Sequence, residues 1–140
     1  MIINLYPYYL CITSGISFIN IGIYLFKKNK DFKRNILAII LFTCLFLSQL
    51  FWINPIQNSL VHKLDAFVAK ITTLLFFVYV FYKNYLKNIF YICIILGIFT
   101  IISFYRSNYY SNIEWCCNDH LFNHGLLHIN GFFISLYVFI

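Results

Sequence analysis

The sequence predicts an all-α integral membrane protein, a bundle of about five transmembrane helices. Hydrophobic residues make up 62% of the 140 residues and charged residues only 10%, an imbalance that a soluble domain of this size could not hide in one core. Five apolar runs also approach the roughly 20 residues that a helix needs to cross a bilayer. These runs are residues 2–26, 35–53, 66–82, 89–105 and 120–140. Since no segment between them is long enough to fold alone, residues 1–140 are predicted to form a single membrane domain.

The ends of the first two runs are marked by residues that suit helix boundaries. Pro7 stands near the start of the first run, where proline is tolerated, and the basic segment 27–34 ends it. The second run closes at Asn54 and Pro55. We therefore expect two antiparallel spans joined by a short basic loop.

The last three runs are also separated by polar breaks. Asp65 and Lys83 bracket the third run, and Arg106 ends the fourth. The stretch 107–119 is rich in Asn, Ser and Tyr, so we expect a loop before the last run.

Lysine and arginine are distributed unequally among the loops, and this predicts the orientation. The first loop holds five of them within 27–34 and the third holds two, whereas the second offers Lys63 and the fourth Arg106. By the positive-inside rule the first and third loops and the C-terminus are cytoplasmic, and the N-terminus is outside or lumenal. The net charge of +6 is then mainly a topology signal, so the expected partner is the lipid bilayer and no nucleic acid.

The five cysteines do not form an obvious framework. Cys11, Cys44 and Cys93 lie within spans, where a lone cysteine behaves as a small apolar residue. Cys116 and Cys117 are neighbours in the fourth loop, and adjacent cysteines rarely bond each other.

Polar residues at membrane depth are costly, so they mark the candidate site. Ser48 and Gln49 lie near the end of the second run, and His62 and Asp65 lie just before the third. The histidines of the last run stand at its beginning, namely His120, His124 and His128. With alternating span directions, all three groups reach the same, non-cytoplasmic side of the bundle.

The three histidines recur every four residues, which places them on one face of a helix. His124 and His128 could share a zinc ion, and His62 could add the third ligand that a catalytic zinc site needs. The alternative is that these histidines only form hydrogen bonds within the bundle or lie hydrated at the membrane interface. Asp65 could likewise be the N-cap of the third helix, while Lys70 is expected to snorkel or to pair with a carboxylate.

A serine in the second span, an aspartate at the start of the third and HxxxH in the last together resemble the CREST superfamily of membrane hydrolases. That superfamily includes the alkaline ceramidases and the progestin and adiponectin receptors. The resemblance implies zinc bound by His124 and His128, with Ser48 and Asp65 as catalytic residues. It also implies a third zinc ligand four residues after the serine, but Trp52 stands at that position. The relatives usually have seven spans where this chain has five.

Two classes of function remain open from the sequence. The first is a metal-dependent hydrolase of a lipid amide or ester, with zinc on His62, His124 and His128, water activated near Asp65, and Ser48 stabilising the oxyanion. The second is a non-catalytic structural or interaction protein whose polar residues join its helices. A carrier or channel is less favoured, because Lys70 is almost alone as a charge within the spans.

Overall fold

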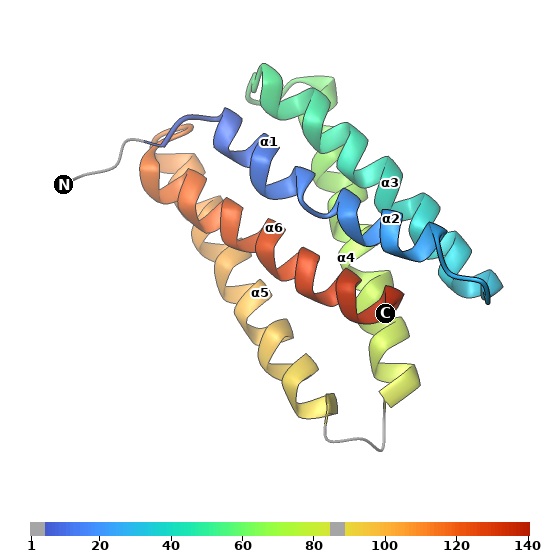
Figure 1. The fold of residues 1–140 in the computed structure, drawn as a ribbon. Helices are drawn as coiled ribbons and strands as arrows, with labels where there is room; N and C mark the ends of the chain where they lie inside the picture. The colour runs from blue at the N-terminus through green and yellow to red at the C-terminus, as the bar shows by residue number, and fades with distance from the viewer. Residues whose placement is uncertain (1–4, 85–88) are drawn as a thin grey trace.

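The computed structural model describes residues 5–84 and 89–140, and the regular structure of these residues is entirely α-helical. Figure 1 shows the helices packed side by side in one bundle. The helices are α1 (Tyr8–Gly15), α2 (Phe18–Leu25), α3 (Phe32–Ile53), α4 (Leu60–Asn84), α5 (Ile89–Ile113) and α6 (Asn118–Phe139). The all-α fold class is therefore confirmed.

Four segments of the described residues are long and apolar enough to cross a membrane. They are Tyr8–Leu25, Phe32–Ile53, Leu60–Lys83 and Phe90–Ile113. The first combines α1 and α2. Helix α6 is as long as α3, at 22 residues, but it carries more polar side chains. Large apolar side chains such as Ile39, Phe67 and Ile101 are more than 60% exposed on the outside of the bundle. Such surfaces are stable in lipid, so the chain is an integral membrane protein that crosses the bilayer several times.

The first span bends where α1 gives way to α2. The backbone N–H of Ser17 bonds to the carbonyl of Ser14, three residues back instead of four. The Ser14 hydroxyl bonds to the Leu10 carbonyl at 2.8 Å, and such back-bonding often bends helices. Residues 2–4 of the predicted first span lie outside the described residues.

Two expected boundaries are wrong. The polar stretch 107–119 was predicted as a loop, but α5 continues to Ile113, because Ser107 is buried against α6 and bonds to it. The N-cap interpretation of Asp65 fails because α4 begins at Leu60. Ser59 caps that helix instead, accepting a bond from the His62 N–H at 3.2 Å.

The last helix lies at the centre of the bundle. It packs against α1, α2, α4 and α5, as the red ribbon in Figure 1 shows. Asn20 of α2 donates to the Phe132 carbonyl at 2.8 Å and to the Ser135 hydroxyl at 2.7 Å. The polar residues of α6 thus face protein on much of its surface.

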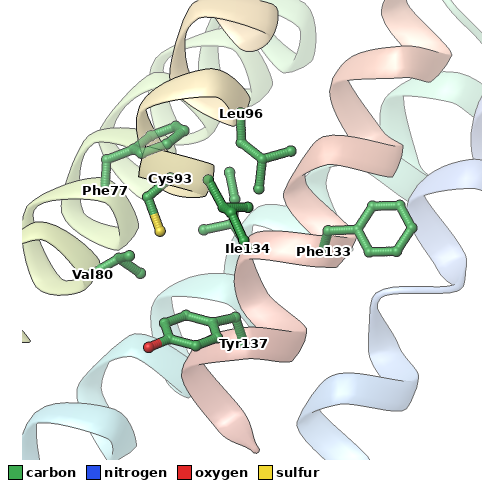
Figure 2. A pocket seen from close by; sticks show the side chains of 8 residues that line it. Phe77, Val80, Cys93, Leu96, Phe133, Ile134 and Tyr137 are labelled. Carbon is green, nitrogen blue, oxygen red and sulfur yellow. The ribbon is translucent and has the colours of Figure 1, made fainter. Parts of the chain in front are cut away.

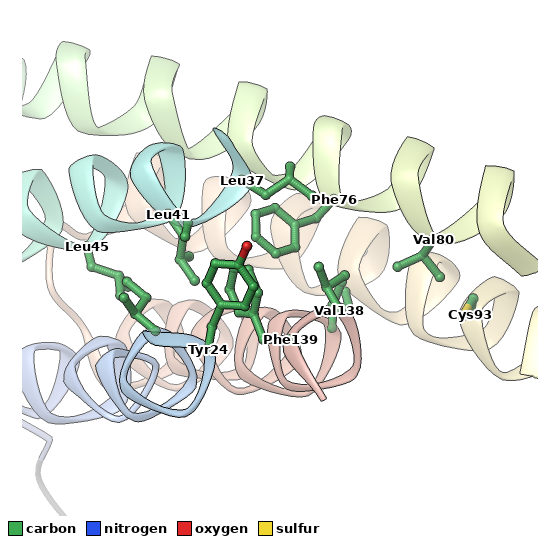
Figure 3. Close-up of a cluster of buried hydrophobic side chains, with 12 residues drawn as sticks. Tyr24, Leu37, Leu41, Leu45, Phe76, Val80, Cys93, Val138 and Phe139 are labelled. Carbon is green, nitrogen blue, oxygen red and sulfur yellow. The ribbon is translucent and has the colours of Figure 1, made fainter. Parts of the chain in front are cut away.

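A cluster of buried apolar side chains forms a core between the helices, and Figure 3 shows it from close by. Tyr24 and Phe139 are almost fully buried in it, with ring centroids 5.0 Å apart. Its other members include Leu37, Leu41, Leu45, Phe76, Val80 and Val138. The Tyr24 hydroxyl reaches out of this core to the Asn35 side chain at 2.6 Å.

The two ends of the bundle differ in chemistry. At one end Lys27 donates to the Ile140 carbonyl and Lys33 lies 5.0 Å from the centre of the Tyr82 ring; we call this the basic end. At the other, the Trp115 indole donates to the Pro55 carbonyl at 3.1 Å. We call this the histidine end, because all four histidines of the sequence lie in that half of their helices.

Candidate functional site

Three histidines form a ladder along α6. The ring centroids of His120 and His124 are 5.9 Å apart, and those of His124 and His128 are 5.0 Å apart. His120 is buried and the other two are half-buried. The predicted single face is confirmed.

Each ladder histidine uses its Nδ1 atom in a hydrogen bond. His128 pairs with the Thr13 hydroxyl of α1 at 2.9 Å, and His124 pairs with the Ser107 hydroxyl of α5 at 3.2 Å. His120 accepts the backbone N–H of Cys116 at 3.2 Å. Nε2 is therefore the nitrogen that each ring has left for another partner, and His120 must carry its proton there because its Nδ1 is an acceptor.

On α3, Trp52 faces the ladder, and Ser48 lies one helical turn before it. The Trp52 ring lies 4.9 Å from that of His124, edge to face. Both side chains are almost fully buried, and neither the Ser48 hydroxyl nor the Trp52 indole N–H has a hydrogen-bond partner among the described residues. Buried polar atoms rarely remain unpaired, so this spot has spare hydrogen-bonding capacity.

His62 is separated from His124 by the indole rings of Trp52 and Trp115. It stacks on Phe51 at 4.8 Å and meets Trp115 at 5.1 Å, and its Nδ1 accepts the backbone N–H of Asn58 at 3.0 Å. Trp115 in turn stacks on Trp52 at 6.3 Å. The rings of Trp115 and Trp52 thus connect His62 to His124, and the two histidines share no direct ring contact in the part of the chain that is described.

Asp65 belongs to the interface between α3 and α4. The stacking of Phe51 on His62 fixes the antiparallel register of these helices. Ser48 precedes Phe51 by three residues and Asp65 follows His62 by three, so in this antiparallel pair they lie at a similar depth in the bundle. Both side chains are buried. No hydrogen bond to the Asp65 carboxyl group occurs within residues 5–84 and 89–140. The predicted catalytic pair therefore lies in the interior of the bundle without a polar contact between its members.

The donor set does not fit a catalytic zinc ion. Within the described residues, no three His, Cys, Asp or Glu side chains are close enough together to hold a metal. His124 and His128 offer two imidazoles one turn apart, but a catalytic zinc site needs three protein ligands and an open position. At the remaining position beside His124 lies Trp52, whose indole N–H is only a donor.

Several residues of this region carried no clear signal in the sequence. Thr13 and Ser107 are ordinary hydroxyl residues within apolar runs, and only their contacts with the ladder reveal a role. The ring centroid of Trp115 lies 5.1 Å from that of His62 and 4.9 Å from that of His120. Trp115 was not predicted as a site residue, because it lies in a polar stretch. Its position next to two cysteines and close to the HxxxH motif was the one signal that could have identified it.

All five cysteines are free thiols. Cys116, between α5 and α6, has a positive φ of 61°, and burial, with Cys117 beside it, raises the pKa of its thiol to about 11. Its backbone N–H, which bonds to His120, is thus held in a left-handed turn that non-glycine residues seldom adopt.

Comparison with known protein families, curated proteins and solved structures finds no match to this chain.

Proposed function

We propose that this chain is a non-catalytic membrane protein with a CREST-like arrangement of residues that lacks the third zinc ligand. The observation that carries the proposal is the contact between Trp52 and His124, with ring centroids 4.9 Å apart. The resemblance places a zinc-binding histidine at position 52. In this chain that position does face the ladder, but an indole occupies it.

The polar contacts support a structural role. The bond from His128 to Thr13 joins α6 to α1, and the bond from His124 to Ser107 joins α6 to α5. Gln49 of α3 donates to the Cys11 carbonyl and to the Ser14 hydroxyl of α1, both at 2.8 Å. Between membrane helices such bonds contribute on average about 0.6 kcal/mol each. Several together hold the bundle in one arrangement without any catalytic step.

We also propose the orientation that the loop charges indicate. The loop before α3, the end of α4 and the end of α6 meet at the basic end, where Lys27 bonds to the Ile140 carbonyl. Placing this end in the cytoplasm leaves the N-terminus and the histidine end outside or in a lumen. Reporter fusions or cysteine labelling should find Lys30 and Lys83 inside and Asn112 outside, and the reverse pattern would refute this orientation.

Zinc content separates the proposal from its competitor, the hydrolase of a lipid amide or ester. Protein purified in detergent without chelators should contain far less than one zinc per chain by elemental analysis. Trp52→His should gain zinc, and adding His124→Ala to it should remove that zinc again. Near-stoichiometric zinc in the unaltered protein that His124→Ala and His128→Ala remove, or lipid hydrolysis that Ser48→Ala abolishes, would establish the hydrolase and end the proposal.

A further inference from the structure

A partly open apolar cavity of about 310 Å³ lies between α4, α5 and α6, in the half of the bundle away from the histidines. Figure 2 shows Val80, Cys93 and Ile134 turned toward the space that these three helices enclose. Phe77, Leu96 and Tyr137 also line it. Because α4 and α5 are long and apolar enough to span a membrane and the walls of the cavity are almost wholly apolar, its natural occupant is a hydrocarbon chain.

A second cavity, of about 420 Å³, continues the first toward the basic end. The two share Phe133 and Tyr137 in their walls, and the second is also lined by Lys83 and Ile140. Lys27 reaches the same place, since it donates to the Ile140 carbonyl. The path therefore runs from an apolar interior to two ammonium groups at the edge of the bundle.

We propose that these two cavities bind one anionic phospholipid of the surrounding bilayer, with an acyl chain between α4, α5 and α6 and the phosphate near Lys83. A transmembrane helix from a partner is too large, because one turn of a helix about 10 Å wide fills about 400 Å³, more than the apolar cavity holds. The cations at its end select a negative headgroup over a zwitterionic one. The proposed function does not involve this lipid site, so either proposal can be wrong without affecting the other.

Native mass spectrometry of the full, delipidated chain tests the proposal directly. Phosphatidylglycerol and phosphatidylcholine with identical acyl chains are added in parallel at equal concentrations. A lysine near an anionic surface favours binding by about fivefold, so bound phosphatidylglycerol should exceed bound phosphatidylcholine by about that factor or more. Lys83→Ala should remove most of the preference. Lys28→Ala is the matched control, since Lys28 is exposed in the adjacent loop and lines neither cavity.

A second pair of variants tests the acyl site. Leu96→Trp places an indole in the cavity and should reduce the binding of both lipids, whereas Ile95→Trp, on a side chain that is 65% exposed, should leave it unchanged. Thermal unfolding shows whether each variant is folded. If Leu96→Trp is not folded, the comparison of Lys83→Ala with Lys28→Ala tests the proposal. Equal binding of the two lipids, unaltered binding in folded Leu96→Trp, or a lipid-free dimer as the only complex would overturn the proposal.

Discussion

The indole of Trp52 meets the imidazole of His124 edge to face, with ring centroids 4.9 Å apart. Trp52 is only 1% exposed and also contacts Trp115 and His120. This one side chain therefore occupies the space between α3, α6 and the loop that precedes α6. It substitutes aromatic packing for the metal ligand that the resemblance implies at its position.

Trp52→Ala should destabilise the protein strongly. Removing a fully buried large aromatic side chain typically costs about 3–5 kcal/mol, because the surroundings collapse only partly into the space. Unfolding in a detergent titration measures the change in free energy. Leu50→Ala on the same helix is the control, because Leu50 is 48% exposed and its loss should cost less than about 1 kcal/mol. Equal effects of the two variants would contradict the central packing role of Trp52.

The bond between His128 and Thr13 should appear as a coupling energy. A double-mutant cycle with His128→Ala and Thr13→Val should give about 0.6 kcal/mol and no more than about 1.7 kcal/mol, the range measured between membrane helices. Thr43→Val serves as the control, because the Thr43 hydroxyl bonds to the Ile39 carbonyl of its own helix at 3.0 Å. A cycle of His128→Ala with Thr43→Val should show no coupling.

Much of the fold follows from hydropathy, because lipid forces each apolar run into a helix that satisfies its own backbone. The period of four also placed His120, His124 and His128 on one face, since this depends only on helix geometry. The end of α5 at Ile113 did not follow. It depends on the contact of Ser107 with His124 across two helices, which no local pattern encodes.

The placement of His62 apart from His124 has a similar cause. The sequence brings His62 to the same end as His124, but it does not say which rings lie between them. Trp115 stands in a segment without periodicity, so its position beside His62 is set by the turn at Cys116 and by its bond to Pro55. Such tertiary placement is beyond spacing arguments, so spacing alone does not reveal that indole rings lie between His62 and His124.

Acid should loosen the histidine end. The Nδ1 atoms of His62 and His120 accept backbone N–H groups from Asn58 and Cys116, and a protonated imidazole cannot accept them. These bonds are therefore intact at neutral pH, and their contribution to stability is lost as the pH falls and the rings take up protons. Hydrogen exchange at the two amides is followed from pH 7.5 to about 3.5, and their protection factors, which remove the intrinsic pH dependence of exchange, should fall as the pH is lowered.

Replacing His120 by Gln tests the cause of that loosening. The Gln side chain carries an oxygen that accepts a hydrogen bond at every pH in this range. The acid-induced loss of protection at the Cys116 amide should therefore disappear, while the loss at the Asn58 amide remains. An unchanged response at Cys116 in this variant would place the acid sensitivity elsewhere.

The Cys116 thiol should react slowly with alkylating reagents. Burial raises its pKa to about 11, with Cys117 adding to the effect, and only the thiolate is a good nucleophile. At pH 7 the thiolate is about one part in ten thousand, and each unit of pH up to about 10 should increase the rate about tenfold. The rate is measured with iodoacetamide on a Cys117→Ser variant, with peptide mapping to locate the label. In the same preparation unfolded by denaturant, Cys116 should react at the rate of an ordinary cysteine, because unfolding removes the burial that raises its pKa. A native rate that already matches the unfolded one at pH 7 would show that Cys116 is not shielded between α5 and α6.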